Sequence, residues 1–451
     1  MLDIRYIREN AGLVQEAALK KGYNVNIQDL LSADTERREL QMKADELRAR
    51  RNEVSGRMKG GQPSPELINE GKQIKTELVE VEDHFRVTDE RFTTILKSVP
   101  NMPSDDVPLG KSEDDNVEAK VVGDKPEYDF VPKNHYEIAE TKGWLDKERA
   151  AKVAGARFAY VMGDLVLLQQ AIIQFVMTTL SNSDKVKEIA AGAGLDIDTR
   201  PFIPVLPPLM IRTEPYDQMD RLEPRDDRYK IEGEELWLQG SAEHVLGSMH
   251  AGEIFEASEL PRRYLGFATS FRKEAGTYGK DMEGLIRMHQ FDKLEMESFT
   301  EAKDGYNEHL LFIAVQEYLL QQLKLPYHVL MKCTADIGKP NARGVDMEAW
   351  LPGQGRYRET HTADYMTDYQ ARRLQTRVRV LVPAPEIDSS HMDELSRLNY
   401  GSKVQLVHTN DATAFALGRC MVAIIENYQT REGDVVIPEV LRPFMGGREL
   451  L

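Results

Sequence analysis

Residues 67–95 read LINEGKQIKTELVEVEDHFRVTDERFTTI, and their mostly apolar repeat positions alternate steps of four and three. These positions are Leu67, Gly71, Ile74, Leu78, Val81, Phe85, Thr88, Phe92 and Ile95. Such spacing forms one stripe along an α-helix, as in one strand of a coiled coil. Pro100 follows the stripe, and proline ends helices. We therefore predict a long helix that needs a partner to cover its stripe.

A second stripe precedes the first one and has the same alternating spacing. It runs through Leu40, Ala44, Leu47, Arg51, Val54 and Met58, and Arg51 is its single poor fit. Between the stripes, residues 60–65 read GGQPSP, which combines the two strongest helix-breaking residues. We predict an antiparallel helical hairpin, an arm over about residues 36–97. At 1.5 Å per residue, roughly 25–30 residues give each helix a length of about 40 Å, too slender for a catalytic core.

The outer part of the first arm helix is basic. Arg48, Arg50, Arg51, Arg57 and Lys59 face a single acid, Glu53, in a chain whose net charge is −17. An RNA backbone could be held at such a segment. The alternative is that these are solubilising charges on an exposed helix, and the residues alone leave both interpretations open.

Length and composition restrict the class of protein. A chain of 451 residues implies two or three domains, and 41% hydrophobic with 29% charged residues is typical of a globular protein. Only Cys333 and Cys420 are cysteines, which argues against a disulfide framework and a cysteine-rich zinc site. The charged opening Met1–Asn10 does not resemble a signal peptide, and no long apolar run is present. We expect a cytoplasmic protein without a membrane segment.

The composition changes between Ser98 and Asn116, where Pro, Ser, Asp and Gly predominate without periodicity, as in a linker. We predict an N-terminal domain over 1–105, a linker over 106–116 and a second domain over 117–451. In the second domain, strand-like runs at Tyr264–Phe271, Leu285–Glu297, Val345–Trp350, Thr376–Val382 and Val404–His408 outnumber the helical stretches between them. This order favours an α+β fold with an antiparallel sheet.

Two of these runs carry polar residues that suit a nucleotide. Phe271–Gly276 and Leu285–Glu295 are joined by a Gly-containing loop, and two strands so joined would bring Arg272, Glu274, Arg287, Phe291 and Glu295 into one cleft. Arginine holds phosphate bidentately, and an aromatic ring stacks on a base. Cross-strand salt bridges are the alternative interpretation of the same residues.

Two later residues extend the nucleotide hypothesis. Glu359 lies in a strand-like run and offers a carboxylate to a hard cation such as Mg²⁺. Arg419 follows Asn410 and Thr413, just inside an expected helix, from which it could reach a terminal phosphate. A helix with one buried, paired arginine would give the same sequence.

Together the segments resemble the seryl-tRNA synthetases over nearly the whole chain. The resemblance is carried by Leu2–Asn10, the hairpin, Glu148–Phe158, the runs around Arg272 and Arg419, and Ile437–Gly447. It implies a class II catalytic domain, an antiparallel sheet with helices, preceded by the coiled-coil arm. It also implies a homodimer whose interface includes Phe202–Ile211, with Pro208 at the motif-1 proline.

The resemblance also implies a role for each site residue. Arg272, Glu274 and Arg419 would be catalytic, and the ATP set would be Arg272, Glu274, Arg287, Phe291, Glu359, Thr362 and Arg419. Serine would be bound by Ser241, Glu243, Arg272, Glu295 and Thr413, and Mg²⁺, the expected cofactor with ATP, by Glu359 and Thr362. The arm residues Arg48, Arg50, Arg51, Arg57 and Lys59 would bind tRNA(Ser), with tRNA(Sec) as a possible second substrate. No zinc is expected.

One stretch departs from the family pattern. Where the family usually reads Ser-Ser-Cys-Ser-Asn, this chain has Thr360–Thr367, which places His361, Asp364 and Tyr365 on the expected pocket floor. Either the pocket is repacked and still selects serine, or the choice of amino acid is altered. A relative that only binds RNA is a further alternative, which the intact Arg272, Glu274, Glu359 and Arg419 argue against. Ser241 stands where the family has threonine and keeps the hydroxyl.

Overall fold

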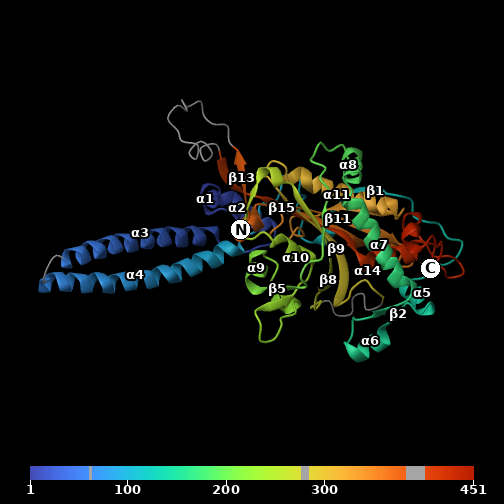
Figure 1. The fold of residues 1–451 in the computed structure, drawn as a ribbon, viewed down its shortest axis with the longest axis horizontal. Helices are drawn as coiled ribbons and strands as arrows, with labels where there is room; N and C mark the ends of the chain where they lie inside the picture. Colours follow the sequence, from blue (N-terminus) through green and yellow to red (C-terminus); the bar gives the residue numbers. More distant parts are fainter. Residues whose placement is uncertain (60–62, 276–283, 382–401) are drawn as a thin grey trace. The chain divides into compact units, whose positions relative to one another are not determined.

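The computed structural model describes residues 1–59, 63–275, 284–381 and 402–451 (Figure 1). They form two compact units, Met1–Met102 and Pro103–Leu451, each of which is described by itself. Part of the predicted hairpin tip, residues 60–62, and the predicted loop over 276–283 lie outside the described residues. The domain limits at 105 and 117 stay predictions.

The smaller unit consists of helices. They are α1 (Ile4–Glu9), α2 (Ala11–Lys20), α3 (Ile27–Met58) and α4 (Pro65–Ser98). Ser64 caps α4, since its side chain accepts from the backbone amide of Leu67 at 3.3 Å, and Pro65 occupies the first turn, where its missing N–H costs nothing. The predicted helical hairpin is confirmed.

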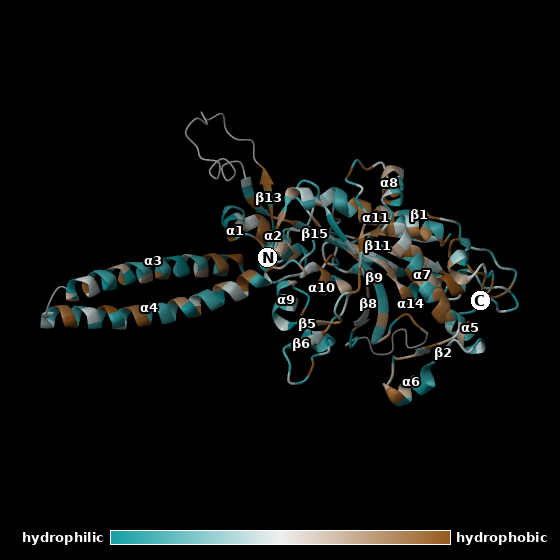
Figure 2. Cartoon of the chain, in the orientation of Figure 1, coloured by the Kyte–Doolittle hydropathy of each residue, from teal (hydrophilic) through white to brown (hydrophobic). Residues whose placement is uncertain are grey.

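The two predicted stripes meet inside the hairpin. Ala44, Leu47 and Val54 of α3 are buried in one cluster with Ile74, Leu78 and Val81 of α4. Arg51, the poor fit in the stripe, is exposed. Figure 2 shows α3 and α4 as largely hydrophilic ribbons interrupted by apolar residues, as expected for helices that bury only one face.

Helix α3 begins well before its stripe. Asn26 caps it by accepting from the Asp29 amide at 3.1 Å, and Leu30 and Ala33 are fully buried. Arg8 of α1 donates to the buried Asp34 at 2.7 Å. The base of α3 is therefore held by α1 and α2, and only the part beyond it is a simple two-helix hairpin.

The larger unit is built on an eight-stranded sheet. In spatial order its strands are β1 (Val117–Val122), β10 (Tyr327–Met331), β11 (Arg343–Leu351), β12 (Arg356–Thr367), β15 (His408–Ala416), β9 (Gln290–Thr300), β8 (Arg262–Phe271) and β4 (Ile203–Val205). Every neighbouring pair is antiparallel except β4 with β8, which is parallel. The predicted α+β class with an antiparallel sheet is confirmed.

Smaller sheets and helices complete this unit. The strands are β14 (Ser402–Leu406), β13 (Arg377–Leu381) and β7 (Ile254–Glu256) in one sheet, β2 (Leu145–Asp146) with β3 (Tyr160–Val161), and β5 (Met210–Arg212) with β6 (Leu236–Leu238). The helices are α5 (His135–Thr141), α6 (Lys147–Val153), α7 (Asp164–Leu180), α8 (Ser183–Gly192), α9 (Thr213–Gln218), α10 (Ala242–Gly247), α11 (Gly305–Gln322), α12 (Tyr369–Leu374) and α14 (Leu417–Asn427). Short 3₁₀ turns are η1 (Glu113–Asp115), η2 (Arg225–Asp227), η3 (Ala257–Glu259) and η5 (Glu439–Met445).

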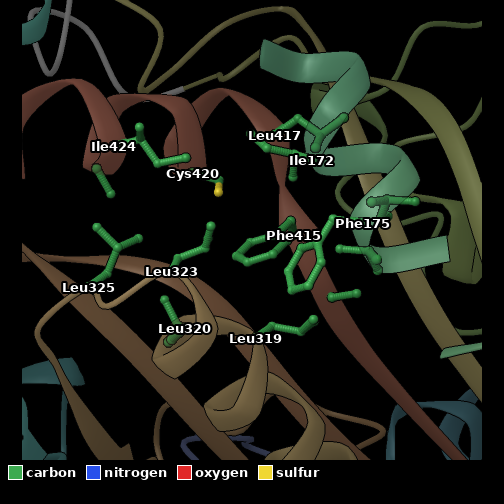
Figure 3. Packing of buried hydrophobic residues seen from close by; sticks show 14 of the residues in the cluster. Ile172, Phe175, Leu319, Leu320, Leu323, Leu325, Phe415, Leu417, Cys420 and Ile424 are labelled. Carbon is green, nitrogen blue, oxygen red and sulfur yellow. The ribbon is translucent and has the colours of Figure 1, made fainter. Parts of the chain in front are cut away.

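Helices α7, α11 and α14 pack their apolar faces on the sheet. Figure 3 shows Leu319 and Leu320 of α11, Phe415 of β15 and Cys420 of α14 meeting in this core. Taken singly, none of the described helices is both long and apolar enough to cross a membrane. The pair α7 and α8, bent by 82° between them, meets the length and composition test only when joined, and both helices carry buried core residues.

Two predicted strands differ from the observed ones. The run Leu285–Glu297 becomes a strand only at Gln290, because the backbone amides of Leu285 and His289 donate to His135 Nε2 at 3.3 Å and to Arg157 O at 3.1 Å instead of to a neighbouring strand. The run Val404–His408 is divided between β14 and β15, since the amide of Val407 donates to Thr376 O. Asn410 and Thr413 consequently lie on a strand, and α14 begins at Leu417.

Candidate functional site

Two adjoining hollows lie along β9, β12 and β15, and we call them together the basin. The first hollow is lined by Arg272, Glu274, Arg287, Phe291 and Arg419, with Thr413, Leu285 and Met288 among its other walls. The second is lined by Arg221, Glu243, Lys332, Asp336, Asp346 and Asp364. Arg272, Lys293, Glu359 and Thr362 line both, so the two hollows share a wall.

A β-bulge in β12 brings Glu359 and Thr362 to the same hollow. Met347 of β11 pairs with His361 and Glu348 pairs with Glu359, which leaves Thr360 as an extra residue. Side chains alternate between faces along a strand, so residues three apart normally point to opposite faces. The extra residue reverses the alternation, and both side chains reach the basin.

A second bulge, in β15, changes which side chains of this strand face the basin and which face the core. Thr413 pairs with Glu295 and Phe415 pairs with Leu294, so Ala414 is the extra residue. Thr413 and Ala416 consequently line the first hollow, whereas Phe415 is buried in the core on the other side. The strand then continues directly into α14, whose first turn places Arg419 at the basin.

The first hollow gathers the residues predicted to bind a nucleotide. Arg272 follows β8, and its Nε donates to Gly240 O at 2.9 Å, which holds its guanidinium 5.4 Å from the Phe291 ring centre. Arg287 Nη1 donates to Glu274 Oε2 at 2.7 Å. Glu274 has a positive φ of 53°, a backbone conformation that is uncommon outside glycine and often marks functional sites. The first hollow thus combines an aromatic face with several cations and two carboxylates, those of Glu274 and Glu359.

Arg419 and Glu359 form an ion pair in the lining of the first hollow, and Glu359 also lines the second. Arg419 Nη1 is 3.1 Å from Glu359 Oε1 and donates to Glu359 O at 2.9 Å. The side chain of Glu359 is 47% exposed, and the nearby cations Arg419 and then Lys332 lower its pKa despite its partial desolvation. Glu359 is therefore charged at neutral pH and available to a cation.

Glu295 lies beneath the shared wall and is fully buried. One oxygen accepts from Thr413 Oγ1 at 3.3 Å, and the other from Ser241 Oγ at 3.2 Å and Lys293 Nζ at 2.5 Å. Burial raises the pKa of Glu295, and Lys293 offsets only part of that effect. This arrangement offers a polar, hydrogen-bonding site for a small amine and hydroxyl.

Arg221 lines the second hollow and pairs with two carboxylates. Its guanidinium contacts Glu243 Oε1 at 3.0 Å and Asp411 Oδ2 at 3.1 Å. Burial alone would raise the pKa of Glu243, but Arg221 outweighs it and holds that pKa well below its ordinary value. Glu243 is consequently an anion in the lining of the second hollow.

The prediction for the divergent stretch Thr360–Thr367 is only partly right. Asp364 lines the second hollow, but His361 and Tyr365 are not on its floor. His361 lies 4.9 Å, ring to ring, from the core residue Phe415, and Tyr365 Oη lies 2.6 Å from His408 Nδ1. Odd-numbered residues of β12 beyond the bulge face away from the basin, which the sequence could not indicate without the position of the bulge.

Three cations of the basin were not predicted. Lys293 precedes Glu295 by two positions on β9, so strand alternation would have placed both on one face. Lys332 ends the apolar run Val329–Met331, where a single lysine is unusual. Arg221 lies in a loop after α9, and no local pattern distinguishes it from exposed arginines.

The predicted RNA-contacting residues lie on the outer half of α3, except Lys59, which directly follows the helix. Arg48 pairs with Glu82 at 2.8 Å and Arg50 with Glu70 at 3.1 Å, both across the hairpin. Arg51, Arg57 and Lys59 are exposed, and within the described part of the chain they have no ion-pair partner. The two groups differ in how readily they could contact a polyanion.

Each of the two units matches a known protein family. Residues 1–103 match the seryl-tRNA synthetase N-terminal domain, and residues 228–428 match the tRNA synthetase class II core domain (G, H, P, S and T). A serine–tRNA ligase from Methanocella arvoryzae is 39% identical, with all of both chains covered.

Two solved structures also resemble the chain along its length. A seryl-tRNA synthetase from Pyrococcus horikoshii complexed with ATP has a TM-score of 0.83 at 34% identity, covering 100% of this chain and 99% of the other. A cytoplasmic serine–tRNA ligase from Naegleria fowleri in complex with AMP has a TM-score of 0.80 at 27% identity, covering 100% and 98%.

Proposed function

The chain belongs to the seryl-tRNA synthetase family, and from that premise we propose how its basin joins serine to tRNA with ATP. The observation that carries the proposal is the shared wall of the two hollows. Cations suited to phosphates line the first hollow, and the buried Glu295 contacts Lys293 and Thr413 of the same lining. A nucleotide and an amino acid held in these two places meet at Arg272, which lines both hollows.

The first step needs cations because two anions must approach each other. A serine carboxylate oxygen attacks the α-phosphorus of ATP, the bond to the bridging oxygen breaks, and pyrophosphate leaves. Arg272 binds between the carboxylate and the α-phosphate, Phe291 stacks on the base, Glu274 binds its amino group, and Arg287 and Arg419 bind the outer phosphates. Each charge-assisted contact contributes about 1.5–3 kcal/mol, so several are required.

Serine is selected by hydrogen bonds and not by size alone. Glu295, Ser241 and Glu243 bind the ammonium, and Glu295 with Thr413 binds the hydroxyl. A site that is built to pair a hydroxyl rejects analogues without it, because its own buried polar groups are left unsatisfied. An additional methylene costs only about 1–3 kcal/mol, so threonine is the harder competitor to exclude.

The residues present also fit a magnesium ion. Among the described residues, no three His, Cys, Asp or Glu side chains form a ready metal cluster. Mg²⁺ in nucleotide sites typically takes one or two protein oxygens and completes its shell with phosphates and water, a role that Glu359 and Thr362 fit. When bound, the ion would neutralise the outer phosphates. Glu359 would then exchange its contact with Arg419 for one with the ion.

The second step transfers the seryl group to tRNA. A ribose hydroxyl at the tRNA 3′ end attacks the carbonyl carbon of seryl-adenylate, and AMP leaves. The arm residues Arg48, Arg50, Arg51, Arg57 and Lys59 bind the tRNA backbone by charge. Charging of tRNA(Sec) as well as tRNA(Ser) stays a prediction. Aminoacylation of a tRNA(Sec) transcript with serine tests it.

We infer a homodimer from the exposed apolar segment that holds Pro208. Leu206 is 79% exposed, and Ile203, Leu209 and Met210 beside it are also exposed. A second copy would cover this segment and the open edge of β4, which is the last strand of the sheet. Sedimentation of the purified protein tests this, since Leu206→Glu should give a monomer. A cytoplasmic location also stays a prediction.

ATP–pyrophosphate exchange with each of the standard amino acids tests the proposed function. Exchange should occur with serine and require Mg²⁺. Exchange with a different amino acid would mean that Asp364 has altered the choice of substrate, and a lack of exchange with all of them would contradict the proposal. Arg272→Ala and Arg419→Ala should each reduce exchange by about 100-fold or more, as loss of charge-assisted phosphate contacts predicts.

A further inference from the structure

Lys332 directly follows β10, and its ammonium is buried in the second hollow. Its Nζ lies 3.0 Å from Thr362 Oγ1, 3.0 Å from Asp364 Oδ1 and 3.4 Å from Asp346 Oδ1. The contact with Thr362 is a hydrogen bond that the ammonium donates, and the contacts with Asp364 and Asp346 are ion pairs. Lys332 is therefore surrounded by polar side chains that its ammonium can hold in place.

Gly344 on the neighbouring strand makes room for this lysine. A Cβ at Gly344 would lie 2.2 Å from Lys332 Cε and 2.7 Å from Asp364 Oδ1, closer than real Cβ contacts. Gly344 pairs in register with Asp364 and has ordinary strand geometry, so its backbone does not require glycine. The missing side chain is explained by the lysine–aspartate pair. Residues of β11 and β12 thus form the space that the Lys332 ammonium occupies.

Burial of such a pair is not expected to contribute much to stability. Desolvation of two charges commonly cancels their attraction, and apolar residues of similar size are often as stable in their place. The partners of Lys332 instead have positions that matter for binding. Thr362 lines both hollows, and Asp364 lines the second.

We propose that Lys332 is a positioning residue, which fixes Thr362 for the Mg²⁺-bound nucleotide and Asp364 for the amino acid. The inference rests on the proposed function, since it assigns the two hollows to these two ligands. Without the ammonium, Thr362 loses a donor to its oxygen, and Asp346 and Asp364 lose the cation that contacts both of them. The side chains of Thr362 and Asp364 then lose their fixed orientation.

The Lys332→Met variant tests the proposal. We expect the Kd of ATP with Mg²⁺, measured by calorimetry without amino acid, and the KM of serine each to rise about tenfold, as for loss of one charge-assisted contact. Because Lys332 acts through Thr362, Lys332→Met should add little to the rise in the Kd of ATP that Thr362→Val causes. Independent, additive effects of the two substitutions would contradict the positioning role.

Arg343 provides a matched control on the next strand. Its side chain is 8% exposed, against 9% for Lys332, and its Nε lies 2.8 Å from Asp106 Oδ2. It precedes Gly344 by one position and so faces away from the basin. Arg343→Met should lower the melting temperature and leave the Kd of ATP and the KM of serine within about twofold, because it removes a buried cation elsewhere.

Gly344→Ala keeps the test decisive if Lys332→Met does not fold. The added methyl group displaces the ammonium without removing any charge, and the same two constants should rise. If Gly344→Ala or a folded Lys332→Met variant has wild-type values of both constants, the inference is wrong. Absence of serine-dependent exchange in the wild-type protein would instead refute the proposed function, so the two failures are distinguishable.

Discussion

Glu297 is a buried carboxyl group with no evident role in the basin. It pairs in register with Asp411 across β9 and β15, and within the described chain neither of its oxygens has a hydrogen-bond partner. Burial raises the pKa of Glu297 well above its ordinary value, and the nearby Asp411 raises it further. The protein therefore retains a proton here that the unfolded chain would release.

This raised pKa predicts a pH-dependent effect of Glu297→Gln. A carboxyl whose pKa is raised by folding stabilises the native state below the unfolded pKa of about 4.3 and loses that contribution as pH rises through the folded pKa. The neutral variant should therefore be more stable than wild type at pH 8, by about 1–3 kcal/mol, and similar to it near pH 4. Thermal unfolding at a series of pH values checks this, with the exposed Glu232→Gln as control. A variant that is less stable at pH 8 would contradict it.

Glu295, two residues earlier on the same strand, should behave differently. Glu295→Ala removes the acceptor shared by Ser241, Lys293 and Thr413. We expect kcat/KM for serine to fall by about 100-fold, which corresponds to loss of a charge-assisted hydrogen bond, while the Kd of ATP changes by less than about threefold. Steady-state exchange and ATP titration measure the two effects. Glu297→Gln is the matched control and should leave both constants unchanged, whereas normal use of serine by Glu295→Ala would refute the assignment.

At the scale of elements, repeated patterns were predictable and single-residue irregularities were not. Spacing alone gave the hairpin, because the buried stripe runs from Leu40 to Met58 and from Leu67 to Ile95. Strand-like runs gave the antiparallel class. The extra residues Thr360 and Ala414 carry no compositional signal, yet they decide which side chains of β12 and β15 reach the basin.

The same distinction applies to the site. Most predicted residues converge on the basin, because the resemblance gave their positions and strand alternation their faces. His361 and Tyr365 could not be placed without the bulge at Thr360. Lys332 could not be recognised as a basin residue, because its three partners come from two other strands. Contacts that depend on how distant strands align with each other cannot be predicted from the local sequence pattern.

The arm offers a prediction about separable activities. Replacing residues 36–97 with a short Gly-Ser turn should leave serine-dependent exchange within about twofold, because every proposed ATP and serine contact lies in Pro103–Leu451. Charging of tRNA(Ser) should fall by about 100-fold or more, because the cationic contacts are lost. The cut leaves Asp34 and its partner Arg8 in place, so the base of α3 is retained. Aminoacylation of a tRNA(Ser) transcript measures the loss, and full charging by the shortened protein would refute the role of the arm.

At the scale of the whole molecule, the net charge of −17 concentrates any attraction for RNA in a few places. Arg51, Arg57 and Lys59 are exposed without ion-pair partners in the described chain, whereas Arg48 and Arg50 are paired. Replacing these three with glutamine should reduce the slope of log Kd for tRNA against log salt by about 2–3, one unit for each released phosphate contact.

Filter binding at several KCl concentrations measures this slope. Arg86→Gln is a suitable control, because Arg86 is an exposed cation of α4 already paired with Glu90 at 3.1 Å. An unchanged slope in the triple variant would mean that the phosphates are held elsewhere.

The two units also differ in when they can form during synthesis. Helices α3 and α4 are consecutive in the chain, so the hairpin can close as soon as its second helix has left the ribosome. The sheet has the opposite property, because β1 pairs with β10 and β9 waits for β15, strands made much later. Early strands therefore remain without their neighbours while translation continues, and closing such long loops is slow. A growing chain of this protein would carry a finished arm long before it could carry a working basin.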